Sequence, residues 1–464
     1  MQRIFAIAWL TWKAALRFRL FLVIAALLIL AVVGLPLIVK DDGTARGFTQ
    51  ILLTYTLSAI TGLLGLSTLW LSCGTLARDI EECQIQVVAT KPIARWQIWL
   101  GKWLGIVTLN AALLAISGAC VFCLLQWRAA RLPAAEQTIL REQVLVARGS
   151  ARPPNPAVEI DAQAKQVLQE RLKSSPELAG SADLPEVEKQ IREQVKAAYQ
   201  IVPPGYTRQW HVDLSSQKES LRDRPLQLRI KFNSATGSGT GGTFTGLWQV
   251  GNSQKMEPWQ SESMSLSPDS FHEFQVPANL LDDKGVLVIT FLNVNNTSLL
   301  FPVEDGMEVL YPDGGFALNF ARGLGIIFCW MALMAAIGLM AASFLSFPVA
   351  AFFSMAVLAV VLSSGTLAET VASGSVGVGN DEKGIAGHSV ADVILIPLFN
   401  GILNVVNLAK GFSPIDSLSS GRVITWGELG AAFGQIVLLL GGVAGVIGIV
   451  LFSRRELATA QGNQ

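Results

Sequence analysis

The feature that most constrains this chain is a series of long apolar segments without a charged residue. Leu20–Val39, for example, has the length of about 20 residues that a helix needs to cross a bilayer. Such a segment must become a helix, because lipid cannot satisfy free backbone N–H and C=O groups. Charged residues make up only 15% of the chain, against about 25% in soluble domains. We therefore predict an α-helical integral membrane protein.

Six spanning helices account for these segments. They fall into two groups, within residues 20–126 and 316–464, on either side of a polar region at 127–315. A turn at 343–348 separates the fourth span from the fifth. The predicted spans are Leu20–Val39, Phe48–Cys73, Leu104–Gln126, Gly323–Ala342, Pro348–Leu367 and Leu429–Phe452.

Six spans place both termini on one side of the membrane, and the basic residues are concentrated on that side. The positive-inside rule assigns it to the cytoplasm. The short loop on the other side has Lys40 and Arg46, which Asp41 and Asp42 offset. We predict a multi-pass protein of the inner (plasma) membrane with cytoplasmic termini and residues 127–315 outside. The basic residues on the cytoplasmic side are Arg3, Lys13, Arg17, Arg19, Arg78, Lys91, Arg95, Lys102, Arg454 and Arg455.

Residues 1–19 contain no acid and have the pattern of an amphipathic helix. Arg3, Lys13 and Arg17 group on one side of a helical wheel, whereas Phe5 and Trp12 lie on the other. This pattern predicts an elbow helix at the cytoplasmic membrane surface, in contact with the lipid bilayer.

The charged stretch at 76–105 lies between the second and third spans. Leu76, Ile80, Cys83 and Val87 fall at helical spacing, and charged residues occupy the rest of the helix. Lys91-Pro92 then ends the helix, because proline has no N–H and disfavours helix in the preceding residue. The stretch is either a helix offered to a partner at the membrane surface or an ordinary solvated loop. Spacing alone does not separate these two interpretations.

The region at 127–315 predicts an extracytoplasmic α + β domain. Residues 127–200 are predicted to be helical, and to form either a stalk or partner surface, or solvated helices packed on the following part. Residues 206–311 change to a period of two, as in Leu226, Leu228 and Ile230. Several such strands at short intervals favour a β-sandwich or jelly-roll.

The segment at 369–427 is predicted to lie on the extracytoplasmic side as well. Its apolar part, Val390–Leu408, is interrupted by Asp392, Pro397 and Asn400. A seventh span here would put Arg454 and Arg455 outside, against the charge bias. We therefore predict a re-entrant or interfacial helix pair.

The motifs of several kinds of chemistry are missing from the sequence. Gly101-Lys102 is followed by Trp103 and lacks the glycine-rich sequence before it, so no Walker A motif is present. His211, His272 and His388 have no paired spacing, and Cys120-x-x-Cys123 has no second pair. We expect no catalytic residue, no metal site, no cofactor bound by this chain, and hence no enzyme. The formal net charge of zero gives no argument for a nucleic-acid partner.

The spans hold no acid or base at their centres, which argues against an ion-coupled carrier. Asn110 and Gln435 are polar groups that either line a pathway or form interhelical hydrogen bonds. Gly441-x-x-x-Gly445 is either the site of a close helix contact or a pair of glycines without a role, since membrane helices commonly tolerate glycine. Trp210 and Trp248 are either stacking platforms for a sugar or lipid, or core residues.

The amphipathic N-terminal helix, the six spans and the charged stretch between the second and third spans together resemble the membrane (permease) subunit of type-2 ABC exporters. Several short motifs support this resemblance. The motifs are Arg78-Asp79-Ile80-Glu81, Gln84-Ile85-Gln86, Thr90-Lys91-Pro92-Ile93-Ala94-Arg95, Leu100-Gly101-Lys102, Pro414-Ile415-Asp416 and Phe452-Ser453-Arg454-Arg455-Glu456-Leu457. Gln84 departs from the family, which often has glycine or threonine there. The large domain at 127–315 is an insertion that many members lack.

The resemblance implies a dimeric exporter in which residues 76–95 form a coupling helix. A separate ATPase subunit would bind this helix and supply ATP, and the second permease would be another copy or a paralogue. Arg78, Asp79, Glu81, Lys91, Pro92 and Arg95 are the residues predicted to couple to the ATPase. The alternative hypothesis is a membrane subunit that moves no substrate and transmits ATPase motion to the β-domain, in a mechanical or sensory role.

Overall fold

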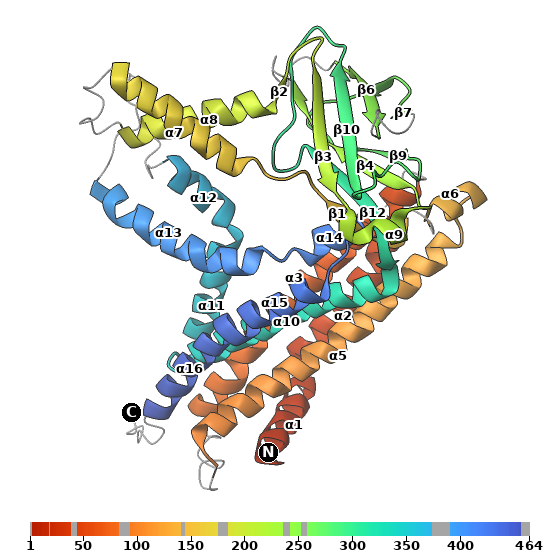
Figure 1. Ribbon diagram of the computed structural model, residues 1–464. Coiled ribbons are helices and arrows are strands. Elements are labelled where there is room, and N and C mark those ends of the chain that lie inside the picture. Colours follow the sequence, from red (N-terminus) through yellow and green to blue (C-terminus); the bar gives the residue numbers. More distant parts are fainter. Residues whose placement is uncertain are drawn as a thin grey trace. The chain divides into compact units, whose positions relative to one another are not determined.

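The computed structural model (Figure 1) describes residues 2–17, 19–38, 44–82, 93–140, 144–174, 184–234, 242–251, 258–373 and 390–455. The chain divides into two compact units. The helical unit comprises residues 1–147 and 314–464, and the β unit comprises residues 148–313. The molecule is thus mostly helical, with a separate β-sheet domain.

Among the described residues of the helical unit, four helices are long and apolar enough to cross a membrane, which is compatible with a membrane protein. The predicted first and fifth spans lie in shorter apolar helices over the described residues, so the count of six spans stays a prediction. The long helices are α3 (Ala45–Glu81), α5 (Arg95–Ala129), α10 (Phe316–Ala342) and the continuous run α15, η4 and α16 (Trp426–Arg454).

Shorter helices complete this unit. The segment at 390–408, predicted to be re-entrant, lies in one of them, and its relation to a membrane stays a prediction. The bounds are α1 (Gln2–Arg17), α2 (Arg19–Ile38), α6 (Ala134–Ile139), α11 (Phe347–Leu362), α12 (Ser364–Ser373), α13 (Val390–Lys410) and α14 (Pro414–Ser419). The last span is divided into α15 (Trp426–Ala432), the π-helical η4 (Phe433–Gly441) and α16 (Gly442–Arg454).

Helix α10 is the centre of the helical unit and packs against α3, α5, α11 and α16. Glycine lets the backbones approach closely at these crossings. A side chain at Gly338 would collide with Ser72 of α3, and one at Gly118 of α5 would collide with Leu324 of α10. Most of the helix is therefore buried inside the unit.

Helices α1 and α2 run parallel to α5. Successive residues along α1 and α2 contact residues of increasing number along α5. A side chain at Gly101 or Gly105 would collide with α1, so glycine is what allows the close approach. The contacting pairs are Ile7 with Gly101, Thr11 with Gly105, Trp12 with Thr108, and Pro36 with Arg128. Helix α1 thus lies along α5, while its predicted place at the membrane surface stays a prediction.

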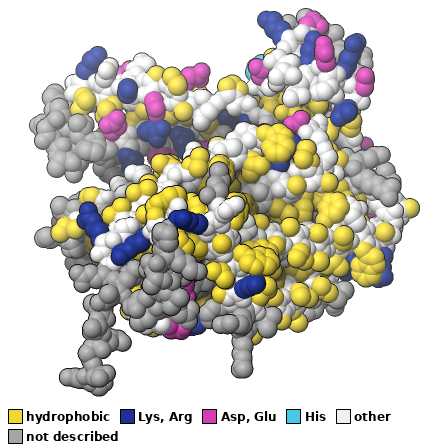
Figure 2. Space-filling view, turned by 90° about the horizontal axis from the view of Figure 1, so that it is seen from below, with side chains coloured by type: hydrophobic (Ala, Val, Ile, Leu, Met, Phe, Trp, Pro, Cys, Tyr) yellow, Lys and Arg dark blue, Asp and Glu magenta, His cyan; other side chains and the backbone are white. Residues whose placement is uncertain are grey.

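Large apolar side chains are exposed on many helices of this unit. Trp9, Ile29, Phe352 and Val446 are each more than half exposed. Figure 2 shows a broad hydrophobic surface with Lys and Arg side chains set within it. Such a surface is unusual in a soluble monomer and suits contact with lipid or a partner.

The described part of the β unit forms three sheets. Their strand orders are β1-β12-β4-β9, β3-β10-β6-β7 with β8 beside β6, and β2-β11-β5. The sandwich or jelly-roll topology stays a prediction. The bounds are β1 (Val146–Ala151), β2 (Ile201–Val202), β3 (Thr207–Asp213), β4 (Leu226–Ile230), β5 (Asn233–Ser234), β6 (Phe244–Val250), β7 (Trp259–Gln260), β8 (Met264–Leu266), β9 (His272–Val276), β10 (Val286–Asn293), β11 (Leu299–Leu300) and β12 (Met307–Gly315).

Strand alternation builds the core of the β unit. In β10, every second side chain from Leu287 to Asn293 is buried. An aromatic cluster fills the core, in which Trp210 and Trp248 stack with ring centroids 6.1 Å apart and Phe301 packs edge-on against both. Trp210 is 8% exposed and Trp248 is 2% exposed. The two tryptophans are therefore core residues, and the hypothesis that they are stacking platforms for a ligand is wrong.

The helices of the β unit are α7 (Ala157–Ser174), α8 (Leu184–Gln200) and the short η3 (Ser215–Gln217) and α9 (Lys218–Leu221). Helices α7 and α8 pack on each other, and an ion pair of 2.7 Å joins Arg192 to Asp161. Lys196 of α8 also pairs with Glu304, at 2.7 Å. The prediction that such helices serve as a partner surface is untested.

Candidate functional site

The helical unit brings together the end of α3, the start of α5, the start of α11 and the ends of α10 and α16. We call this cluster the junction. It flanks residues 83–92, which lie outside the described residues. The junction is defined by Arg78, Asp79, Glu81, Arg95, Trp99, Lys102, Ser343, Phe347, Phe452, Ser453 and Arg455.

An ion pair joins the end of α3 to the start of α5. Lys102 Nζ lies 2.5 Å from Asp79 Oδ2 and donates a second hydrogen bond of 2.6 Å to the carbonyl of Thr75. Lys102 is 7% exposed, and burying an ammonium group is costly unless it is paired. Asp79 and Thr75 together provide that pairing, so the two helices that precede and follow residues 83–92 in the sequence are joined to each other.

Arg95 caps the end of α16. Its Nη1 donates hydrogen bonds to the carbonyls of Phe452, Ser453 and Arg455, at 3.1, 2.8 and 2.8 Å. The last carbonyls of a helix have no partner within that helix, and a cation is favourable beside them because of the helix dipole. Arg455 in turn donates to the carbonyl of Ser343 at the end of α10. A chain of caps therefore links α5, α16 and α10.

Trp99, one turn after Arg95, fits into a notch of α16 formed by Gly445 and Gly448. A Cβ at Gly448 would lie 2.9 Å from the indole nitrogen of Trp99, and a Cβ at Gly445 would lie 3.3 Å from the ring. Among the described residues, a Cβ at Gly441 would instead come near the carbonyl oxygen of Ile436 in its own helix, at 3.4 Å. The helix contact suspected at Gly441 and Gly445 thus belongs to Gly445 and Gly448.

Glu81 and Arg78 hold the start of α11. A carboxylate oxygen of Glu81 accepts the backbone N–H of Phe347 at 2.8 Å. The Arg78 guanidinium lies 4.4 Å from the centroid of the Phe347 ring, which also packs edge-on against Trp70 at 5.3 Å. The last turn of α3 therefore fixes the position of this helix start.

Four of the six predicted coupling residues thus have partners inside the chain: Arg78, Asp79, Glu81 and Arg95. Lys91 and Pro92 lie outside the described residues. Residues 76–81 also continue α3 and do not begin a separate surface helix, since α3 ends at Glu81. The prediction of a separate partner helix is therefore wrong for residues 76–81, which belong to the end of α3.

Asn110 and Gln435, predicted as possible pathway residues, lie in different surroundings. Asn110 is 2% exposed and donates a hydrogen bond of 2.8 Å from α5 to Thr68 Oγ1 of α3. This contact favours the interhelical hydrogen bond over a pathway role. Gln435 is half-buried in the π-helical η4, and its role stays a prediction.

Sequence reasoning missed Trp99 and Phe347 as members of the junction. A signal exists for Phe347, because Ser346-Phe347-Pro348 is a helix start with proline in the first turn. The signal for Trp99 is weaker, since only a pair of glycines in a distant helix makes room for it. Neither contact follows from spacing along the chain.

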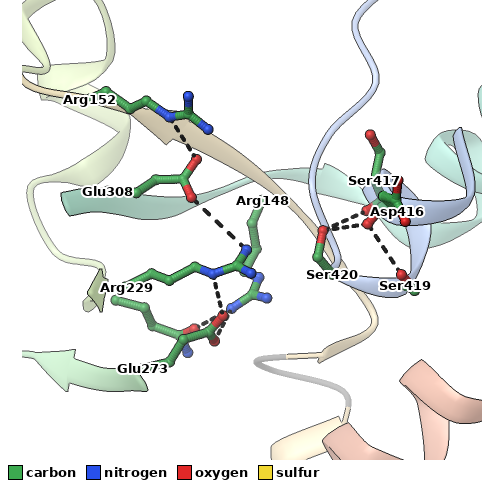
Figure 3. A network of polar contacts seen from close by, with 10 residues as sticks. Arg148, Arg152, Arg229, Glu273, Glu308, Asp416, Ser417, Ser419 and Ser420 are labelled. Atoms are coloured by element: carbon green, nitrogen blue, oxygen red, sulfur yellow. Dashed lines mark hydrogen bonds and ion pairs between the residues drawn. The ribbon is translucent and has the colours of Figure 1, made fainter. Parts of the chain in front are cut away.

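A second polar cluster lies in the β unit, on the sheet β1-β12-β4-β9. Glu308, Arg229 and Glu273 stand directly opposite one another on three strands, and Figure 3 shows the ion pairs that join them to Arg148 and Arg152. We call these five residues the charge ladder. Its members form ion pairs mainly with one another. We therefore assign the charge ladder a role in stabilising the sheet and not in binding a ligand.

Among the described residues, no group of His, Cys, Asp and Glu side chains is arranged to hold a metal ion. Comparison of the chain with protein-family models, curated proteins and solved structures finds no match. The resemblance to type-2 ABC exporters therefore depends on the sequence motifs alone.

Proposed function

We propose that this chain is the permease subunit of an ABC exporter in the plasma membrane, driven by a separate cytoplasmic ATPase. A second permease copy or paralogue completes the complex. The observation that supports this proposal most is the junction, because both flanks of residues 83–92 are fastened to helices. A force applied to that short segment therefore reaches α3, α5, α11 and α16.

The junction divides the predicted coupling residues into two roles. Four of them position helices, since their charges are used by groups within the chain: Arg78, Asp79, Glu81 and Arg95. Lys91 and Pro92 are then the residues of the predicted set that are left for contact with the ATPase. ATP is bound and hydrolysed by the partner, because this chain has no Walker A motif.

The proposal is tested by purifying the full-length tagged protein in mild detergent from membranes of its own cells. We expect vanadate-sensitive ATP hydrolysis to co-elute, together with an ATPase subunit identified by mass spectrometry. Replacing Lys91 and Pro92 with alanine should lower its recovery at least about tenfold, which corresponds to roughly 1.4 kcal/mol of binding. Lys173→Ala, on the exposed face of α7, is the matched control.

Two outcomes would overturn the proposal. One is the absence of any co-eluting ATPase from membranes in which the protein is abundant. The other is equal recovery of the ATPase by the wild type and the Lys91/Pro92 variant, which would remove residues 83–92 as the docking site.

The second candidate function is a subunit that moves no substrate and passes ATPase motion to the β unit. The observation in its favour is that residues 148–313 form a compact unit with its own aromatic core. The chain enters this unit along β1 and leaves along β12, which are neighbours in one sheet. A short Gly/Ser linker can therefore replace residues 148–313 with little disturbance of the helices.

That deletion separates the two functions. Cells that still export a lipophilic dye such as Nile red through the shortened protein would favour the permease. Cells that lose envelope integrity, while ATP hydrolysis by the complex continues, would favour transmission to the β unit.

A further inference from the structure

Helix α11 is attached to the rest of the helical unit mainly through its first half. Its buried residues are Ala350, Ala351 and Ser354. Farther along, and on its outward face, apolar side chains are strongly exposed; Phe352 and Leu362 are each 76% exposed. A helix with few buried contacts beyond its first two turns is easily displaced at the other end.

Helix α11 packs against both α3 and α10, and the specific side-chain contacts at its start come from α3. Trp70 packs edge-on against the Phe347 ring, and Gly74 leaves space for the same ring. Cys73 Sγ lies 3.4 Å from Ser354 Oγ. With Arg78 and Glu81, these contacts follow one face of α3 for its last three turns, so α11 starts on a surface that α3 provides.

The cap of α11 is supplied by α3 as well. Ser346 occupies the N-cap position, but its side chain makes no capping hydrogen bond. The Phe347 N–H is instead bound by Glu81, 266 residues away in the sequence. A carboxylate at this place satisfies a free N–H and is favoured by the helix dipole.

We propose that Glu81 and Arg78 are positioning residues that make α11 follow the end of α3. Movement of the last turn of α3 then tilts α11 about its first two turns, while α5 and α16 move together through Arg95 and Trp99. The role in ATPase-driven movement rests on the proposed function; the attachment of α11 to Glu81 does not.

The attachment is tested by double electron–electron resonance on the full-length protein in lipid nanodiscs. One spin label replaces Phe352 on α11 and the other Ile116 on α5, after Cys83, Cys120 and Cys123 are changed to serine. The control pair is Ile116 with Val446 on α16. All three labelled positions are more than 60% exposed, so the labels disturb the packing little.

We expect one narrow distance for the α11 pair in the wild type. Glu81→Ala should add a second, broad population for this pair and leave the control pair unchanged. Glu81→Gln should restore the narrow distance, because the amide oxygen still accepts the Phe347 N–H. A merely structural loss would change both pairs.

The inference is overturned if Glu81→Ala leaves the α11 distance unchanged, or if both pairs broaden together. Should Glu81→Ala fail to fold, Phe347→Ala tests the part of the attachment that Arg78 and Trp70 provide, since it keeps the N–H but removes the ring between them. In that variant an unchanged α11 distance would contradict the inference, and a broadened one would support it.

The final arm adds the co-purified ATPase, ATP and vanadate. The α11 distance should shift in the wild type and in Glu81→Gln, and should not shift in Glu81→Ala, although ATP hydrolysis continues in all three. An equal shift in all three would overturn the inference and leave the proposed function standing. Failure to obtain any ATPase would count against the proposed function, while the label result without ATP would still decide the attachment.

Discussion

Besides the Lys102–Asp79 ion pair, the helical unit has charged side chains that act differently from those of the charge ladder in the β unit. In the helical unit, Arg95 and Glu81 bond to main-chain groups at the ends of neighbouring helices. In the β unit, Arg229 and Glu308 pair with other charged side chains across the strands. The difference follows from secondary structure, because helix ends leave N–H and C=O groups free, whereas paired strands use theirs in the ladder.

Substitution of a charged residue should therefore destabilise different parts of the molecule in the two units. A charge that caps a helix end contributes mainly to the position of that helix, so its loss should loosen a local part of the unit. A charge in the ladder is compensated by oppositely charged neighbours that are buried with it. Its loss leaves these neighbours with less compensation and should weaken the whole sheet.

The largest effect is expected from Arg229→Met. Arg229 is 14% exposed and stands between Glu273 and Glu308 in register. Removing one partner of a buried ion pair costs about 3 kcal/mol. Hydrogen exchange of the full-length protein, followed by mass spectrometry, should show roughly hundredfold faster exchange in peptides from β4, β9 and β12.

The control for this prediction is Arg192→Met. Arg192 and Asp161 form an ion pair on the surface, with side-chain exposures of 52% and 47%, and solvent screening leaves such pairs little effect on stability. Equal exchange in the two variants would show that the charge ladder does not stabilise the sheet.

The next effect, in the helical unit, depends on space rather than charge. Gly338→Ala would place a methyl group against Ser72 where α10 crosses α3. We expect a loss of about 2 kcal/mol, measured by thermal unfolding in detergent, because the two backbones must separate. Gly62→Ala is the matched control, since no atom lies within 4 Å of the added methyl group. Similar melting temperatures for both variants would contradict this account of the crossing.

The sequence predicted the general classes of structure in both units. Uncharged segments predicted apolar helices, and four long ones are present. The alternation of Leu226, Leu228 and Ile230 predicted a strand with buried side chains, which β4 confirms. These features depend on neighbours along the chain, so periodicity and composition are sufficient to predict them.

The junction could not be predicted in the same way. Arg95 and Glu81 were predicted to bind a partner, because exposed charges between two spans have no visible partner in the sequence. Their partners are backbone groups at Ser453 and Phe347, more than 250 positions away. Only the packing of helices from both parts of the chain brings these groups together.

A smaller effect is expected from Arg95→Ala, which removes the cap of α16. The cost should be about 1 kcal/mol, because several charge-assisted hydrogen bonds to carbonyls are exchanged for bonds to water. Hydrogen exchange should accelerate at 449–455 and remain unchanged in the β unit. Arg95→Lys should be intermediate, since an ammonium group lacks the planar fork of the guanidinium.

Arg131→Ala is the control for this cap. Arg131 stacks on Trp127 just beyond the other end of α5, so its loss should leave 449–455 protected. Unchanged exchange in Arg95→Ala would show that the three carbonyl contacts do not hold the end of α16.

The smallest effect concerns an exposed pair in the β unit, between Lys196 of α8 and Glu304. The hydrogen bond from Lys196 holds the pKa of Glu304 below its ordinary value of 4.5. A carboxylate with a lowered pKa in the folded state adds stability above pH 4.5, and this contribution disappears as the pH falls through the folded-state pKa. Because Glu304 is 58% exposed, solvent screening limits the contribution to about 0.5 kcal/mol.

Lys196→Gln should therefore lower the melting temperature slightly at neutral pH, and the difference from the wild type should vanish at acidic pH. A difference that persists or grows in acid would show that the substitution acts through packing of α8 and not through the ion pair. The contrast with Arg229→Met then sharpens the comparison between charges of the β unit. The Lys196–Glu304 pair lies at the surface, whereas Glu308 in the ladder has only 3% of its side chain exposed and is stabilised by the charges buried beside it.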